Sequence, residues 1–316
     1  MAFIRTSQCA LKTHIAIYLL LELTKIMPVA NFSRIVIIQS LFSGDEFTGT
    51  KLHEDLETLN SFHDLGLEVD LINIERKDEL FGALKGIREK TKDGSYPLLH
   101  LEIHGSNDTS GLILSSRDYV GWSELKGPLT EINIACRLNL IVILAVCYGA
   151  HLMQIIQPVD RAPCWGLIGP TEEIKCGLIL KSFYEFYKVL IETGSGAEAF
   201  KILAKLRDNE GFKGAYRFSN AEYFFKTVYL RYKEEECSPS SISKRAKRMY
   251  RKMKKEKGNS LRSVGQIKRD LRRTQEEYFY KYSENFFMCD LFEENKSRFN
   301  VKYKEVVEGK TSNNTP

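Results

Sequence analysis

Short apolar runs rich in β-branched residues alternate with segments of helical periodicity through the first two thirds of this 316-residue chain. Strand-like runs cover residues 34–41, 67–74, 97–103, 139–146 and 164–168. Helical patterns cover residues 52–65, 79–90, 124–136, 150–156, 174–192 and 197–206, with a break expected near Gly127-Pro128. Such alternation favours crossover helices on both faces of a mostly parallel sheet. The expected fold class is therefore α/β, with a small hairpin over 111–114 and 119–122.

The chain divides into three expected regions: an N-terminal helical extension (1–32), an α/β domain (33–235) and a basic helical region (236–316) that contains a linker-like break over 238–241. Residues 15–27 are apolar, but Glu22 and Lys25 interrupt them. This run predicts an amphipathic helix that packs on the domain, with a membrane anchor as the alternative. It is short for a bilayer span, so no stable membrane insertion is expected.

The charge of the chain is unevenly distributed. Residues 244–273 contain fourteen Lys and Arg against Glu256 and Asp270, a net charge of +12. Because the whole chain carries +5, the remainder carries −7. The basic segment is a candidate contact for nucleic-acid phosphates, an anionic membrane surface or an activating protein. A solvated helical face and a set of self-cleavage sites are the other interpretations.

The cysteines argue against disulfide and zinc frameworks. Their number is odd, and no Cys-x-x-Cys pair occurs. Their spacing is irregular: Cys9, Cys136, Cys147, Cys164, Cys176, Cys237 and Cys289. A reducing, cytoplasmic setting is therefore expected, with no metal and no cofactor.

Two of the expected strands end in residues suited to nucleophilic chemistry. One runs into His104-Gly105 and the other into Cys147. The carboxyl ends of parallel strands meet at one sheet edge, so both side chains are expected there. Cys147 would be the nucleophile, aided by the dipole of the following helix, and His104 the proton shuttle. The N–H groups of Gly105 and Cys147 would face the oxyanion, with glycine at 105 leaving room for substrate.

A second arrangement is a nucleophile elbow of the α/β-hydrolase kind, with Cys147 in place of serine. That arrangement needs a catalytic histidine late in the chain. Only His151 follows Cys147, four residues later. It lies too close in sequence to act as a separate base.

The two strand ends resemble those of the caspase-like cysteine peptidases, which include caspases, metacaspases, legumain-like enzymes, separase and the bacterial CHAT domains. These families share a hydrophobic strand that ends in His-Gly and a later strand that ends in the catalytic Cys, with Gly soon after. Residues 98–105 and 141–149 fit that pattern. The CHAT branch is the most similar, because His100 stands four residues before His104, a hairpin follows, and residues 183–199 resemble its helix–loop–helix.

This resemblance, over about residues 33–230, implies a caspase-like sandwich and a Cys-His dyad. Cys147 would be the nucleophile and His104 the general acid/base, while we interpret His100 as structural. Many relatives have a polar residue two positions before the cysteine, where this chain has Ala145. The S1 pocket would then take its charge from four acidic residues, which favour Arg or Lys at P1: Asp45, Glu46, Glu172 and Glu173. A preference for Asp would need a basic pocket, for which only Arg117 and Arg161 are candidates.

The function expected from the resemblance is cleavage of a specific protein substrate, regulated by a partner, in a bacterial defence system such as antiviral defence or a cell-death pathway. The alternative is a non-catalytic caspase-like module that binds nucleic acid or a protein through residues 244–273.

Overall fold

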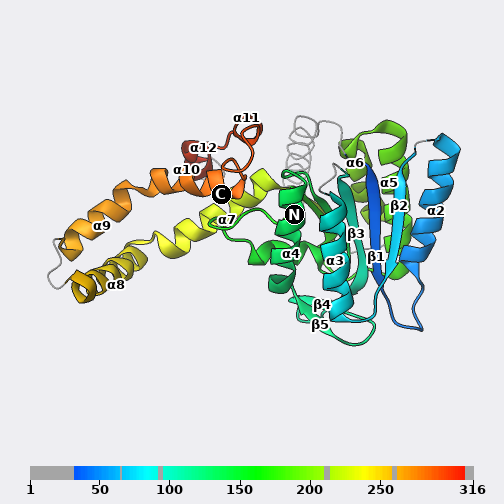
Figure 1. The fold of residues 1–316 in the computed structure, drawn as a ribbon, viewed down its shortest axis with the longest axis horizontal. Helices are drawn as coiled ribbons and strands as arrows, with labels where there is room; N and C mark the ends of the chain where they lie inside the picture. Colours follow the sequence, from blue (N-terminus) through cyan, green and yellow to red (C-terminus); the bar gives the residue numbers. More distant parts are fainter. Residues whose placement is uncertain (1–31, 65, 92–94, 210–213, 258–261, 310–316) are drawn as a thin grey trace, which may run out of the picture.

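The computed structural model describes residues 32–64, 66–91, 95–209, 214–257 and 262–309. The expected helix over 15–27 lies outside these residues. An α/β body carries the central sheet, and a helical region extends from its side (Figure 1). The strands are β1 (Arg34–Ser40), β2 (Glu68–Asn73), β3 (Pro97–Gly105), β4 (Gly111–Ile113), β5 (Tyr119–Gly121), β6 (Ile141–Ala145), β7 (Gly166–Pro170) and β8 (Tyr216–Asn220).

The helices of the body alternate with these strands, and those of the C-terminal region follow one another. In the body they are α2 (Thr48–His63), α3 (Lys77–Thr91), α4 (Trp122–Ala135), the 3-10 helix η1 (Gly149–Ile155), α5 (Cys176–Thr193) and α6 (Gly196–Asn209). Further along lie α7 (Ala221–Glu236), α8 (Pro239–Lys257), α9 (Val264–Arg273), α10 (Gln275–Phe286), α11 (Asn295–Arg298) and α12 (Tyr303–Glu308).

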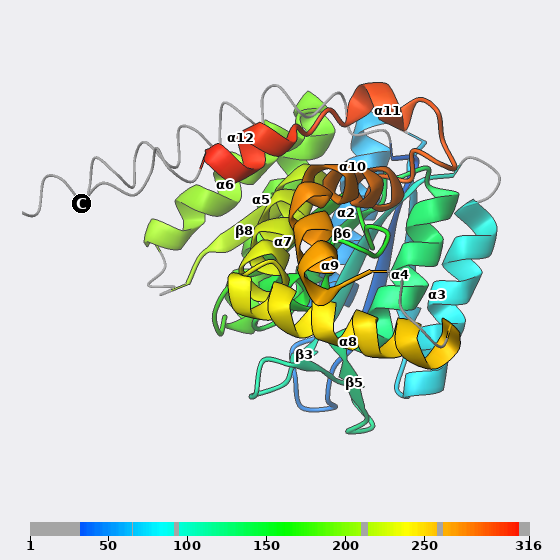
Figure 2. The ribbon, with the colours of Figure 1, turned by 90° about the vertical axis from the view of Figure 1, so that its left-hand side faces the viewer.

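The central sheet has the strand order β2-β1-β3-β6-β7-β8, and the β4–β5 hairpin extends from the end of β3. All neighbours are parallel except β7 and β8, so the mostly parallel sheet is confirmed. Helices α2 and α5 cover one face, and α3 and α4 cover the other (Figures 1 and 2). The hydrophobic core lies between these layers.

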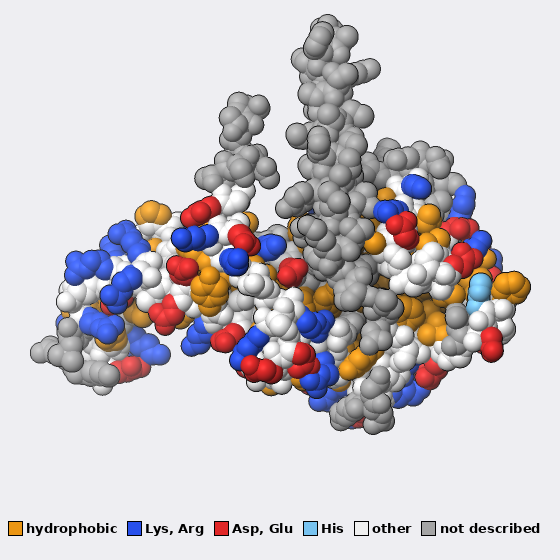
Figure 3. Space-filling view, turned by 90° about the horizontal axis from the view of Figure 1, so that it is seen from above, with side chains coloured by type: hydrophobic (Ala, Val, Ile, Leu, Met, Phe, Trp, Pro, Cys, Tyr) orange, Lys and Arg blue, Asp and Glu red, His pale blue; other side chains and the backbone are white. Residues whose placement is uncertain are grey.

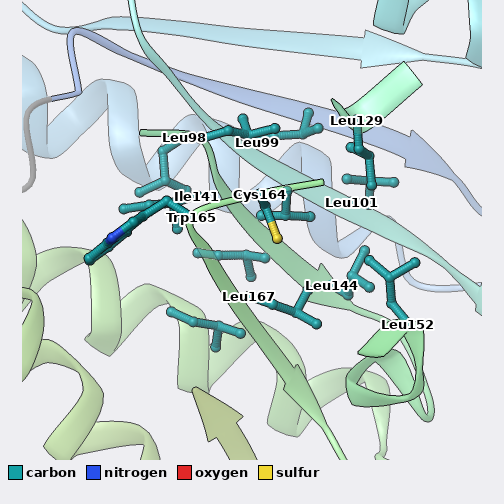
Figure 4. Close-up of a cluster of buried hydrophobic side chains, with 14 of the residues drawn as sticks. Leu98, Leu99, Leu101, Leu129, Ile141, Leu144, Leu152, Cys164, Trp165 and Leu167 are labelled. Atoms are coloured by element: carbon teal, nitrogen blue, oxygen red, sulfur yellow. The ribbon is translucent and has the colours of Figure 1, made fainter. Parts of the chain in front are cut away.

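The core reflects the near-continuous apolar character of the central strands, as expected for strands covered on both faces. Leu99 of β3 and Leu144 of β6 are fully buried. Figure 4 shows leucines of these strands beside Leu129 of α4 and Leu152 of η1. This packing holds β3 and β6 next to each other in the sheet.

Several sequence expectations about the body are corrected. Helix α4 continues through Pro128, because Leu125 and Leu129 on either side of it anchor one buried face. The helix expected over 150–156 is the 3-10 helix η1. Strand β8 was missed, because its sequence has no apolar run and Arg217 within it is exposed. The fifth strand begins two residues later than expected, at Gly166.

The C-terminal region is helical in its described part, as expected. Pro239 opens α8 only three residues after α7 ends, and Ser238 accepts a hydrogen bond from Ser241 N–H at 3.2 Å. Phe225 of α7 packs against aromatic rings of the C-terminal region, with ring centroids 5.2–5.3 Å apart: Phe279, Phe286 and Phe287. The C-terminal region is thereby joined to the body by an apolar cluster.

Candidate active site

The candidate site forms where the direction of strand order reverses, at the carboxyl ends of β1, β3 and β6. Open α/β sheets place their functional crevice at such a switch point. Glu102 of β3 pairs with Ala145 of β6. His104 stands two residues beyond Glu102 within β3, and Cys147 stands two residues beyond Ala145, in the turn that follows the end of β6. Neighbouring strands lie about 4.8 Å apart, so the two strand ends that lead to His104 and Cys147 are adjacent.

The backbones of Gly105 and Cys147 are in close contact, which confirms that the two strand ends converge. A Cβ atom placed on Gly105 would lie 2.1 Å from the Cys147 carbonyl oxygen and 3.2 Å from the Cys147 Cβ. Glycine is thus required at 105 by the approach of the Cys147 backbone. The expected reason, room for a substrate, is replaced by this one.

The N–H of Gly105 is directed away from the hairpin. Ser106 N–H donates to the Gly111 carbonyl at 2.9 Å, while Gly105 pairs with Leu112. Hydrogen-bonded and non-hydrogen-bonded pairs alternate along an antiparallel ladder, so the Gly105 N–H points to the side of β6. This orientation suits the role of oxyanion donor that the sequence assigns to Gly105.

Asp45 contacts the candidate catalytic histidine. Its Oδ2 accepts hydrogen bonds from Nε2 of His104 at 2.7 Å and from the Phe42 N–H at 2.7 Å. The Asp45 N–H in turn donates to the Phe42 carbonyl at 2.9 Å, which closes the loop after β1 into a turn. An Nε2–H that donates to a carboxylate leaves Nδ1 of His104 as the proton acceptor. Asp45 therefore positions His104 and is not available to an S1 pocket.

His104, Phe42 and Arg117 form a stack of three side chains, with the Phe42 ring in the middle. The ring of Phe42 stacks on His104 with centroids 4.6 Å apart and planes 14° apart. The Arg117 guanidinium lies 3.9 Å from the Phe42 centroid, on the turn of the hairpin. Burial of Asp45 would by itself raise the pKa of its carboxyl group. Hydrogen bonds from His104 and the Phe42 N–H, together with the charges of His104 and Arg117, outweigh burial, so the pKa of Asp45 is lowered. Sequence alone gave no signal for this stack.

Cys147 is half-buried at the start of a turn. Its Sγ donates a hydrogen bond to the Ile174 carbonyl at 3.7 Å. Tyr148 has a left-handed backbone with φ of 62°. In a nucleophile elbow the nucleophile itself is the strained residue, whereas here the strained residue is the one after Cys147. The helix that follows, η1, is a seven-residue 3-10 helix. The expected support of the thiolate by an α-helix dipole is therefore not provided.

A second thiol, Cys176, lies beside the candidate pair at the start of α5. The residue as a whole is exposed, but desolvation of its thiol, followed by the charges of Asp45, Cys147 and Glu102, raises the pKa of Cys176. A raised pKa keeps this thiol protonated and less nucleophilic. The sequence could not indicate its proximity to Cys147, because the two belong to different βα units.

The remaining residues assigned to the S1 pocket have different surroundings. Glu46 forms an exposed ion pair with Lys51 at 2.6 Å. Glu172 and Glu173 are exposed on the loop after β7, where the Tyr148 N–H donates to the Glu172 carbonyl at 3.4 Å. Partial desolvation, followed by the charges of Glu173 and Glu172, raises the pKa of the Tyr148 hydroxyl. Both carboxylates therefore lie near Tyr148, the residue that follows Cys147.

The two candidate basic residues also differ in position. Arg117 lies over the site in the stack described above. Arg161 instead forms a bidentate pair with Asp290 at 2.8 and 2.6 Å. It thus anchors the C-terminal region and is not a candidate for the substrate pocket.

His100 belongs to a buried polar network below the site. Its Nε2 contacts Glu102 Oε1 at 3.0 Å, and its Nδ1 contacts the Tyr187 hydroxyl at 3.1 Å. Thr48 of α2 donates to the other Glu102 oxygen at 2.8 Å. His100 and Glu102 are fully buried or nearly so. The network links β3 to α2 and α5, so the contacts of His100 are those of a structural residue.

Comparisons with known proteins add no relative: neither the known protein-family models nor the curated proteins include a match to this chain. Within the described ranges, no three His, Cys, Asp or Glu side chains are grouped as a metal site. None of the described helices is both long enough and apolar enough to cross a bilayer.

Proposed function

We propose that this chain is a cysteine endopeptidase of the caspase-like type. The single observation that carries the proposal is that two adjacent strand ends lead to His104, which Asp45 orients, and to Cys147. The resemblance supports it, since the β4–β5 hairpin follows His104-Gly105 and the helix pair α5–α6 follows β7. The resemblance to caspase-like peptidases implies a regulated role in bacterial defence or cell death.

The proposed reaction is acyl transfer through a thioester. Nδ1 of His104 removes the Cys147 proton, and the thiolate attacks the carbonyl carbon of the scissile peptide bond. The oxyanion accepts hydrogen bonds from the N–H groups of Gly105 and Cys147. The imidazolium then protonates the leaving amine, and a water deprotonated by His104 hydrolyses the thioester to release the acid and the free thiol.

The proposed preference is for Arg or Lys at P1. It now rests on Glu172 and Glu173, because Asp45 is bound to His104 and Glu46 to Lys51. Both remaining carboxylates are exposed on the loop that contacts Tyr148. A substrate cation next to the scissile bond would meet a negative charge there.

A panel of peptides with Arg, Lys or Asp at P1 tests the proposal. Wild type should cleave the Arg and Lys peptides, Cys147→Ala should lose at least about 1000-fold in kcat/KM, and Cys176→Ala should retain cleavage. The Glu172→Gln/Glu173→Gln double variant should lose its discrimination against Asp. Cleavage that survives in Cys147→Ala would refute the assignment, and the non-catalytic module would then be the better description.

A further inference from the structure

The helices α8 and α9 form an arm that projects from the body. They lie side by side as a helical pair, and the chain returns to the body through α10 (Figure 1). Figure 3 shows Lys and Arg side chains gathered over this arm. We call α8 and α9 together the basic arm. It lies outside the candidate active site, and the peptidase chemistry does not use it.

The basic arm presents a regular stripe of cations on one face of α8. The four side chains of this stripe are exposed and follow a spacing of four, three and four residues, about 16 Å of helix: Lys244, Arg248, Arg251 and Lys255. None of the four forms an ion pair with a residue in the described ranges. Exposed Arg269, Arg272 and Arg273 add charge on α9.

The opposite face of α8 is apolar and already covered. Ile242 and Ala246 are buried, as is Ile267 of α9. A helix that lies on a membrane needs an exposed apolar face rich in Trp, Phe or Leu. The arm exposes only Met249 among its described large apolar side chains, so it lacks the element that would enter a bilayer.

The composition of the arm also distinguishes between forms of nucleic acid. Proteins that hold single strands combine cations with aromatic side chains on which the bases stack. Residues 239–273 contain one aromatic residue, Tyr250, and it is half-buried. A cationic stripe without stacking side chains contacts phosphates and does not read bases.

We infer that the basic arm binds the phosphate backbone of a nucleic-acid duplex without sequence preference, through the stripe of Lys244, Arg248, Arg251 and Lys255. Guanidinium groups suit this partner, because they bind phosphate oxygens with two parallel hydrogen bonds. The remainder of the chain outside residues 244–273 has a net charge of −7, so it would repel phosphates, and the electrostatic attraction for a nucleic acid is confined to the arm. Duplex binding would bring the body to a nucleic acid.

Fluorescence anisotropy with the full chain and labelled 30-base-pair DNA and RNA duplexes tests this inference between 50 and 200 mM salt. Wild type should bind with a Kd of about 10⁻⁶–10⁻⁴ M at physiological salt. Replacing the four stripe residues with Gln should reduce the magnitude of the log K against log salt slope by about 3.6. The matched control removes four exposed charges elsewhere: Lys85→Gln, Lys205→Gln, Arg217→Gln and Lys304→Gln.

The control should keep the slope of the wild type, and circular dichroism should show both variants folded. Equal loss in the control and the stripe variant would overturn the inference. So would tighter binding to a single-stranded 30-mer, or binding to phosphatidylserine vesicles without binding to either duplex. Salt-sensitive self-association without duplex binding would assign the arm to a second copy of the chain and would also overturn it.

Discussion

The carboxylate of Asp45 accepts a hydrogen bond from Nε2 of His104 at 2.7 Å, across 59 residues of sequence. The contact joins the loop after β1 to the end of β3 and fixes the orientation of the imidazole. Phe42 stacks on the ring from the same loop. Asp45 is therefore a third group that holds His104 of the proposed dyad.

Replacing Asp45 with Asn should lower kcat. The amide keeps the shape of the carboxylate but does not stabilise the imidazolium that forms in the reaction. We expect kcat to fall by about 100-fold with little change in KM, as measured by steady-state cleavage of an Arg peptide. Glu46→Gln is the control, because Glu46 pairs with Lys51 at the surface. Equal kcat values for wild type and Asp45→Asn would contradict the positioning role.

The contribution of Asp45 to stability should depend on pH in one direction. Its folded-state pKa is lowered below the ordinary value of 3.8, despite burial, by His104, the Phe42 N–H and Arg117. A carboxylate with a lowered folded pKa stabilises the protein above its unfolded pKa and loses this effect as pH falls through the folded value. The difference in thermal midpoint between wild type and Asp45→Asn should persist at pH 5 and shrink below 3.8. A difference already absent at pH 5 would argue against the contact.

Replacing Gly105 with Ala should displace Cys147. The new Cβ would overlap the Cys147 carbonyl oxygen, so the strand ends must separate. We expect a loss of about 1–3 kcal/mol in stability by denaturant unfolding, together with loss of peptidase activity. Gly82→Ala is the matched control, because a Cβ there has open space on helix α3 and should stabilise by about 0.5–1 kcal/mol. An active Gly105→Ala enzyme would show that the close approach is unimportant.

The network around Glu102 should matter for stability far more than surface ion pairs do. Truncating Glu102 to Ala leaves His100 and the Thr48 hydroxyl without their buried partner. We expect a cost of about 3–5 kcal/mol in urea unfolding. Glu68→Ala removes a carboxylate whose Lys90 partner is exposed, and it should change stability by less than about 1 kcal/mol. Similar costs for both variants would mean that the network adds nothing.

Much of the sheet could be predicted from the sequence because its strands are buried on both faces. Near-continuous apolar runs mark β1, β3 and β6, and their ends place His104 and Cys147 at one edge. Strand β8 escaped prediction because an edge strand with an exposed Arg217 has no such run. Pro128 misled the prediction of α4, because burial of neighbouring leucines outweighs the lost hydrogen bond.

The surroundings of the candidate catalytic pair could not be predicted, because they come from loops and a helix start that are far apart in the sequence. Asp45 follows β1, Arg117 lies on the hairpin and Cys176 begins α5, and only the folded chain brings them together. Counting acidic residues near strand ends assigned Asp45 to substrate binding, whereas its hydrogen bond assigns it to His104. Loop charges become informative only when their partners are known.

The most direct test of the proposed Cys147–His104 dyad is covalent labelling by a peptidyl acyloxymethyl ketone with Arg at P1, mapped by mass spectrometry on the intact chain. A positioned thiolate displaces the acyloxy group and forms a thioether. We expect an adduct on Cys147 that is lost in His104→Ala and strongly reduced in Asp45→Asn. Labelling of Cys176 or Cys237 in place of Cys147, or labelling of Cys147 that is indifferent to His104, would contradict it.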